Sequence, residues 1–359
     1  MNEEDGSAVR RWLFRAVGVA LGLVMAELAA RLVLASPTVT RRLHGPHALF
    51  VNAMAEFGSR RGQTRVDWTE SQHPITPDPA FGWVNKPGVF DDAGSTITIS
   101  AQRLRALRNY TLDVPQGKTR VLVLGDSFAF GASVNDADVF SAQLEERDGS
   151  LEVLNFGVPG YGLDQALLLF QAEGVRYHPD IVVVNVVSVL ESRERASFTS
   201  WLKPYFTVSD GRFVLHGVPV PSPWEAYERY LKSSRLLDVA SLVADAWFTG
   251  QDQIPDAQRP LLDRLVTLVR QSGARPVLVF APSGDDYGNT GGSRMAEEPC
   301  TDSDVACIDT TPEFARASES GVDLWNMKHW NAAGHRIVAE ALAVRLRRLR
   351  DADPRLRVR

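Results

Sequence analysis

The amino-acid sequence predicts an α/β fold, a three-layer α/β/α sandwich with a central parallel sheet, preceded by an N-terminal transmembrane helix. Between residues 116 and 350, short apolar segments rich in β-branched residues alternate with longer amphipathic ones. This alternation is typical of a parallel sheet with crossover helices. The short segments lack polar alternation, as expected of strands buried on both faces. One long apolar stretch near the N-terminus predicts the transmembrane helix.

The elements of the sandwich can be assigned in chain order. Apolar runs predict four strands, and amphipathic stretches predict four helices. The strands are expected at 121–124, 151–156, 180–187 and 276–280, and the helices at 137–146, 163–175, 257–271 and 331–350. Such sheets carry their functional groups at the carboxyl ends of the strands. The candidate segments for a site are therefore 125–127, 157–160 and 188–191.

The regions that flank the sandwich are predicted to be less regular. Prolines and glycines punctuate residues 37–115, which we interpret as a linker and strands that pack onto the main domain. The alternating segment 96–99 is one such strand. The sandwich is assigned to residues 116–350, and residues 351–359 form a tail.

The overall composition excludes some classes of function. The chain has 359 residues, 44% of them hydrophobic, which is enough to bury a sizeable core. A formal net charge of -5 gives no reason to expect nucleic-acid binding, which normally needs a basic surface. The histidines outside 329–335 are scattered among loops, so no metal site is predicted. No cofactor is expected. Nothing in the sequence indicates an oligomeric state.

The N-terminal segment resembles a membrane anchor. Arginines precede an apolar stretch at 12–36, which we interpret as an uncleaved signal anchor after a cytoplasmic tail at 1–11. Glu27 and Arg31 interrupt the stretch, but their i,i+4 spacing lets them pair on one helical face, and Arg31 can reach the interface. A cleaved signal peptide and an amphipathic cytosolic helix are the alternatives. The basic residues before the stretch predict that the rest of the chain faces the periplasm or the extracellular side.

The two cysteines, Cys300 and Cys307, lie close together in an Asp-rich segment. They are either unrelated free thiols or partners in a short-loop disulfide. The second interpretation requires an oxidising compartment, so an extracytoplasmic location favours it.

Ser127 has the sequence context of a nucleophile. It lies directly after a buried strand and before a helix, in the segment Gly125-Asp126-Ser127. A serine at the carboxyl end of a strand needs a base to take its proton and donors to hold an oxyanion. The alternative is a tight turn in which the serine only caps the helix.

Three segments resemble the signature blocks of SGNH/GDSL hydrolases, in the same order. They are Val123–Gly131 (VLGDSFAFG), Asn155–Gly162 (NFGVPGYG) and His329–His335 (HWNAAGH). The resemblance covers most of residues 75–350 and implies the flavodoxin-like SGNH-hydrolase fold. The segment Pro79–Trp83 and the Glu27/Arg31 pattern also resemble membrane-anchored bacterial members of the family. It also implies that Ser127 is the nucleophile, that His329 is the general base, and that the backbone N–H groups of Ser127 and Gly160 form the oxyanion hole.

Two positions depart from the family pattern. Leu190 stands where the third block has an asparagine that donates to the oxyanion, and Asn326 stands where an aspartate orients the histidine. Asn326 can still accept a hydrogen bond from the imidazole, but it cannot stabilise an imidazolium as a carboxylate does. Asp323 and Glu191 are possible substitutes.

Three functions remain open on this sequence. The first is an extracytoplasmic serine esterase or acyl hydrolase whose substrate, by family resemblance, is an O-acylated cell-surface glycan. The second is an O-acyltransferase for exported polysaccharide, in which a sugar hydroxyl replaces water. The third is a catalytically degenerate SGNH-like domain that binds a glycan or a partner, and the changes at Leu190 and Asn326 motivate it.

Overall fold

The computed structural model describes residues 3–43, 46–59, 74–92, 94–187, 193, 197–199, 201–209, 211–248, 258–284 and 305–356. The chain divides into two compact units. Unit 1 consists of Met1–Asp67 and Pro221–Asp252, and unit 2 of Trp68–Val220 and Gln253–Arg359. The segment Pro221–Asp252, which follows the third predicted strand, thus groups with the N-terminal region, a grouping that the sequence did not indicate.

Unit 2 is built on a five-stranded sheet. In spatial order the strands are β11 (Ala306–Asp309), β10 (Arg275–Ala281), β7 (Ile181–Val187), β5 (Thr119–Leu124) and β6 (Leu151–Asn155). Every neighbouring pair is parallel, and β5, β6 and β7 are buried along their whole length. The predicted parallel sheet is confirmed, and its strand order is flavodoxin-like.

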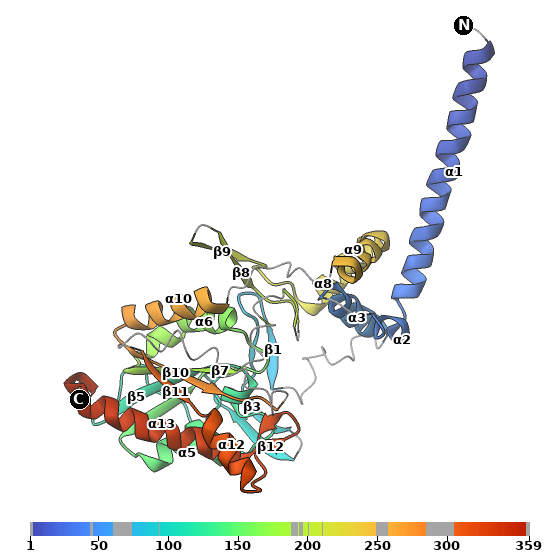
Figure 1. Ribbon diagram of the computed structural model, residues 1–359. Coiled ribbons are helices and arrows are strands. Elements are labelled where there is room, and N and C mark those ends of the chain that lie inside the picture. The colour runs from blue at the N-terminus through green and yellow to red at the C-terminus, as the bar shows by residue number, and fades with distance from the viewer. Residues whose placement is uncertain are drawn as a thin grey trace. The chain divides into compact units, whose positions relative to one another are not determined.

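Helices cover both faces of this sheet (Figure 1). On one face lie α6 (Leu163–Ala172) and α10 (Gln258–Gln271), and on the other α5 (Phe140–Arg147), α12 (Thr311–Glu319) and α13 (Ala332–Ala352). α10 is amphipathic, as its sequence predicts, and turns Leu261, Leu265 and Val269 into the core. The three-layer α/β/α sandwich is therefore confirmed. Two short 3-10 helices, Gly174–Tyr177 and Pro354–Leu356, follow α6 and α13.

Short antiparallel pairs complete unit 2. β1 (Ile75–Asp78) pairs with β2 (Gly82–Asn85), β3 (Gly88–Asp92) with β4 (Ser95–Ile99), and β8 (Tyr205–Ser209) with β9 (Arg212–His216). The strand predicted at 96–99 is β4. Phe90, Ile97 and Ile99 of the β3–β4 hairpin form a buried cluster with Phe130. Because Phe130 ends the short helix α4 (Ser127–Phe130), this cluster packs the hairpin against the segment that holds Ser127.

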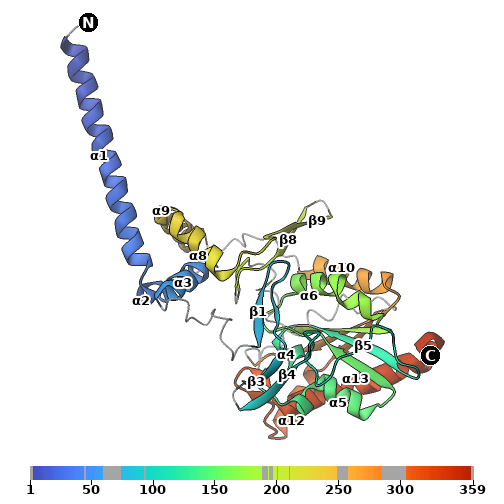
Figure 2. The same ribbon diagram turned by 180° about the vertical axis from the view of Figure 1, so that it is seen from behind.

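Unit 1 is helical. It contains α1 (Glu3–Leu34), α2 (Pro37–Thr40), α3 (Pro46–Ser59), α8 (Pro223–Lys232) and α9 (Arg235–Phe248). Within α1, Arg10–Leu34 is long and apolar enough to cross a membrane, by length and composition. Figure 2 shows α1 as one continuous helix, with α2, α3 and α9 gathered near its C-terminal end. The helix α3 lies where the sequence suggested an irregular linker.

Candidate active site

Ser127 lies at a tight turn between β5 and α4. Gly125 adopts φ +154, and a Cβ at this position would come within 2.7 Å of the Ala129 Cβ and 3.1 Å of the Asn185 Cβ, so glycine is required here. Asp126 is the N-cap of α4, because its carboxylate accepts a hydrogen bond from the Phe128 N–H at 2.9 Å. The Ser127 side chain follows at the carboxyl end of β5 and is only 6% exposed.

His329 lies beside Ser127, although 202 residues separate them in the chain. The His329 Nε2 is 2.8 Å from the Ser127 Oγ. This distance lets a neutral imidazole accept the hydroxyl proton. Of the predicted site residues, the structure thus brings the proposed nucleophile and base into hydrogen-bond contact.

Several residues of the segment HWNAAGH, which begins at His329, have a structural role. His329 and Trp330 form β13, which pairs with β12 (Trp325–Asn326) in a two-stranded turn. Trp330 is fully buried and donates its indole N–H to the Pro282 carbonyl at 2.8 Å. Asn331 is the N-cap of α13 and accepts from the next two free N–H groups of that helix. The backbone that follows His329 is therefore anchored by a buried indole and by a helix cap.

The second block is fastened to the first by buried polar contacts. The Asn155 amide donates to the Ala129 carbonyl at 2.8 Å and to the Ser141 Oγ at 2.9 Å. A Cβ at Gly157 would collide with the backbone of Ala129 and Phe130, so only glycine allows this approach. These contacts bring the turn after β6 close to the turn after β5.

Gly160 lies in that turn with φ +83. Its neighbours are both anchored, since Trp83 donates from its indole N–H to the Pro159 carbonyl at 2.8 Å. The Tyr161 hydroxyl donates to the Trp83 carbonyl at 2.6 Å. The backbone on either side of Gly160 is therefore fixed, which is what a preorganised N–H donor requires.

Arg193, which the sequence analysis did not single out, joins the two blocks. Its Nη1 contacts the Asp126 carboxylate at 2.8 Å and donates to the Tyr161 carbonyl at 2.8 Å. Asp126 is completely buried, and the Arg193 side chain is 16% exposed. The guanidinium therefore neutralises a buried carboxylate next to Ser127 and also holds the residue after Gly160. The only sequence feature that could have indicated Arg193 is its position three residues after Leu190, in the segment after the third predicted strand.

The predicted orienting residue, Asn326, contacts another group. Its amide donates to the Ser133 carbonyl at 3.0 Å, while its backbone pairs with that of His329. The Ser133 N–H and Oγ in turn contact the Asp92 carboxylate, at 2.8 and 3.3 Å. Asp92 ends β3 and is a second residue that the sequence analysis missed. Its only signal was the turn sequence Asp91–Gly94.

The other predicted site residues either make contacts away from the Ser127–His329 pair or lie outside the described residues. Asp323 is exposed, and its carboxylate accepts from the Trp325 N–H of its own turn at 3.1 Å. Leu190, Glu191 and Cys300 lie outside the described residues. Cys307, in β11, is disulfide-bonded.

Burial and the surrounding charges together set the protonation of His329. Burial lowers the pKa of His329 below its ordinary value, and the positive charge of Arg193 lowers it further. The carboxylates of Asp126 and Asp92 act in the opposite direction and raise the pKa, but burial prevails. At neutral pH the imidazole is therefore mostly neutral, which is the form that can accept a proton from Ser127.

This protonation state predicts a pH profile. If His329 is the base, kcat/KM for an ester should stay high as pH falls below 6.5 and drop only when the imidazole becomes protonated. The Asp92→Asn variant removes a carboxylate that raises the pKa, so its acid limb should lie at lower pH than that of the wild type. Initial rates with a neutral ester between pH 4 and 8 would measure both limbs. An unchanged limb in Asp92→Asn would contradict the electrostatic role of Asp92.

Comparison with known proteins finds similarity in structure but no relative by sequence. No protein-family model matches the chain, and no curated protein is found as a relative. Among solved structures, the chain is similar to a member of the lipolytic G-D-S-L family from Veillonella parvula DSM 2008. That likeness has 10% identity and a TM-score of 0.40, and covers 63% of this chain and 96% of the other.

Two acetylxylan esterases are also similar in structure. One, AlAXEase, has 15% identity and a TM-score of 0.38, with 62% of this chain and 97% of the other covered. The second is a catalytic mutant of an acetylxylan esterase from Geobacillus stearothermophilus, with 14% identity and a TM-score of 0.38. It covers 65% of this chain and 95% of the other.

Proposed function

We propose that this protein is a membrane-anchored serine esterase that acts outside the cytoplasm on an O-acylated substrate. The observation that carries the proposal is the 2.8 Å contact between the Ser127 Oγ and the His329 Nε2 at the carboxyl end of β5. A buried serine beside a mostly neutral imidazole is the arrangement that activates a hydroxyl for attack on a carbonyl.

The reaction proceeds in two steps. In the first, the Ser127 Oγ attacks the ester carbonyl while its proton passes to the His329 Nε2. The tetrahedral oxyanion is held by the N–H groups of Ser127 and Gly160, and it collapses as the alcohol leaves with the proton from His329. In the second step, water gives a proton to His329 and attacks the acyl-enzyme, which releases the carboxylic acid and restores Ser127.

The N-terminal region and one cysteine support the proposed location. The apolar helix segment Arg10–Leu34 is long enough to serve as the anchor, and the arginines before it favour a cytoplasmic N-terminus. Cys307 is disulfide-bonded, which fits an oxidising compartment. The substrate we propose is an O-acylated cell-surface glycan, on the family resemblance of the three blocks.

A fluorophosphonate probe tests the nucleophile directly, because it reacts only with an activated serine. We expect the full-length protein to be labelled, Ser127→Ala to lose all labelling, and Ser320→Ala, which removes an exposed serine, to keep it. Release of acetate from acetylated glycans, measured with the same three proteins, would then test the substrate. Labelling that survives in Ser127→Ala would overturn the assignment.

One observation favours a second candidate, a degenerate binding domain. The amide of Asn326 is directed to Ser133, and no carboxylate among the described residues is within hydrogen-bond distance of the His329 ring. A wild-type protein that fails to react with the probe while still binding an acylated glycan would support this candidate instead.

A further inference from the structure

The charged residues inside the apolar helix α1 have partners within unit 1. Glu27 and Arg31 form an ion pair at 2.8 Å, as their i,i+4 spacing predicts. The Glu27 carboxylate also accepts from the backbone N–H groups of Arg235 and Leu236 at the start of α9, at 3.0 and 3.1 Å. It therefore caps the N-terminus of α9, where the helix dipole favours a negative charge.

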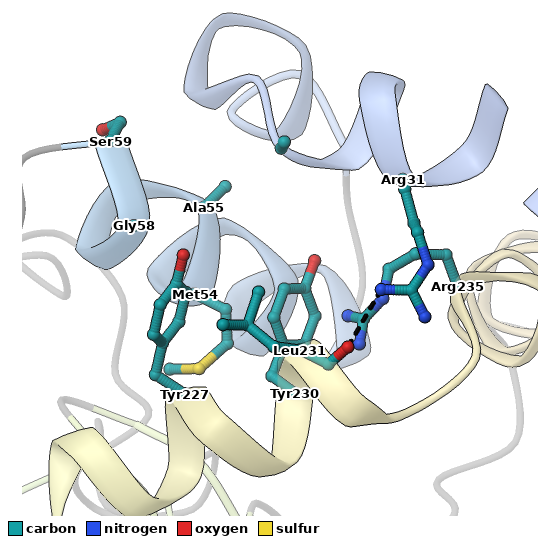
Figure 3. A pocket seen from close by; sticks show the side chains of 10 residues that line it. Arg31, Met54, Ala55, Gly58, Ser59, Tyr227, Tyr230, Leu231 and Arg235 are labelled. Atoms are coloured by element: carbon teal, nitrogen blue, oxygen red, sulfur yellow. Dashed lines mark hydrogen bonds between the residues drawn. The ribbon is translucent and has the colours of Figure 1, made fainter. Parts of the chain in front are cut away.

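Arg31 makes the complementary contacts to the end of α8. Its guanidinium donates to the carbonyls of Leu231 and Ser233, both at 2.9 Å. Figure 3 shows Arg31 reaching across to the Leu231 carbonyl, in a pocket that Tyr227 and Tyr230 of α8 also line. We call these contacts of Glu27 and Arg31 with the α8–α9 turn the Glu27–Arg31 junction. The junction fixes the start of α9 to a defined level of α1.

This level lies within the apolar length of α1. Glu27 precedes the end of α1 at Leu34 by seven residues, or about 10 Å at the rise of an α-helix. Beyond the junction, α1 still exposes apolar side chains, since Leu32 is 78% and Val33 51% exposed. A bilayer that surrounds α1 up to its C-terminal end would therefore also reach the start of α9.

Over residues 235–244, the part of α9 whose side chains the structure describes, the exposed surface is apolar where a water-facing helix would be polar. Its outward side chains, which we call the outer face of α9, are Leu237, Val239, Ala240 and Val243. The charged residue among them in sequence, Asp238, instead points inward and pairs with Arg235 and His47. Leu237 is 67% exposed, more than Val239 or Val243. An apolar outer face with the charge turned inside is typical of a helix in contact with lipid.

The aromatic residues at the same end of unit 1 agree with this arrangement. Trp224, near the start of α8, is exposed, and Tyr227 and Tyr230 line a cavity of about 250 Å³ together with Arg31 and Met54 (Figure 3). Tryptophan and tyrosine are enriched at the level of lipid headgroups, where one part of the ring is apolar and the other contacts water.

We propose that the outer face of α9 lies in the lipid bilayer interface, so that unit 1 binds the membrane through α9 as well as through α1. The inference rests on the membrane anchoring proposed above. It assigns the occupant of the outer face as phospholipid, because that face adjoins the exposed apolar surface of α1 at the Glu27–Arg31 junction. With this assignment, Glu27 and Arg31 lie at the membrane boundary. Their charges are compensated by each other, by the N-terminus of α9 and by the C-terminus of α8.

Lipid-based quenching tests the proposal on the full-length chain. Single cysteines would be introduced by Leu237→Cys and Val243→Cys on the outer face, by Glu228→Cys on the exposed, charged side of α8, and by Leu21→Cys in the middle of α1. Each variant would carry a bimane label in phosphatidylcholine–phosphatidylglycerol vesicles, with or without phosphatidylcholine that bears a nitroxide. The nitroxide would lie high on the acyl chain for the labels at 228, 237 and 243, and near the end of the acyl chain for the label at 21. Because all four side chains are exposed, the substitutions should leave the fold unchanged.

We expect the labels at 237 and 243 to lose about half or more of their intensity to the nitroxide, since an interfacial helix buries its apolar face roughly 5–10 Å deep. The label at 228 should keep its intensity. Quenching at 21 without quenching at 237 and 243 would overturn the proposal and leave the anchor intact. No quenching at 21 would instead contradict the anchor itself. A blue-shifted but unquenched label at 237 would mean that a second copy of the chain covers this face, and would also overturn it.

Discussion

Replacing Ser127 and His329 together is expected to cost no more activity than replacing either one alone. The two side chains share one proton-transfer step across a 2.8 Å contact, so the loss of one makes the other useless for attack. We expect Ser127→Ala and His329→Ala each to lower kcat/KM for p-nitrophenyl acetate by on the order of 10³ or more, and the double variant to match them.

The control for this cycle is an exposed histidine. His178 lies far along the chain from both residues and adopts φ +47, so asparagine, which tolerates the left-handed region, is a suitable replacement. The variant His178→Asn should keep the wild-type rate. Losses that add up in the Ser127→Ala/His329→Ala double variant would show two independent contributions, and would argue against a nucleophile–base pair.

The elements that carry Ser127 and His329 could be predicted from the sequence for a physical reason, whereas the pairing of the two residues was implied by the resemblance to the signature blocks. The apolar run before Ser127 predicts a buried strand, and the Asn331 cap with the following amphipathic stretch predicts the helix after His329. Both elements can be predicted because each depends on the pattern of a few neighbouring residues. The structure forms them as β5 and α13 and leaves the two side chains in contact.

The residues that surround this pair could not be predicted in the same way. Arg193 reaches Asp126 across 67 residues of chain, and Asp92 reaches Ser133 across 41. A single arginine or aspartate in a loop carries no periodicity, and its partner is set by tertiary packing. The same holds for unit 1. Glu27 and Arg31 predict an ion pair by their spacing, but nothing local indicates that both also bind the α8–α9 turn more than 200 residues later.

The largest effect outside the pair itself is expected at Arg193. In the variant Arg193→Met the completely buried Asp126 carboxylate loses its cationic partner. Removing one partner of a buried ion pair typically costs about 3–5 kcal/mol of folding free energy. The turn after Gly160 also loses the donor that holds the Tyr161 carbonyl, so kcat/KM should fall in the fraction that stays folded. Thermal unfolding and ester hydrolysis would measure the two losses separately.

A matched pair of controls separates charge from packing at this site. Arg176→Met removes an exposed arginine from an ion pair with Glu173, and should change stability by less than about 1 kcal/mol. Adding Asp126→Asn to Arg193→Met removes the unpaired buried charge and leaves an amide oxygen that can still cap α4. The double variant should therefore regain much of the lost stability. If it does not, the role of Arg193 is packing and not neutralisation of Asp126.

The pH profile of Arg193→Met distinguishes an electrostatic role from a purely structural one. The guanidinium lowers the pKa of His329, whereas Asp126 and Asp92 raise it. Without Arg193 no positive charge offsets the two carboxylates, so the pKa of His329 should rise and the acid limb of kcat/KM should move to higher pH. In Arg193→Met/Asp126→Asn one of these carboxylates is gone, and the limb should return toward its wild-type position. A guanidinium that served only to fasten two turns would leave the limb where it is in both variants.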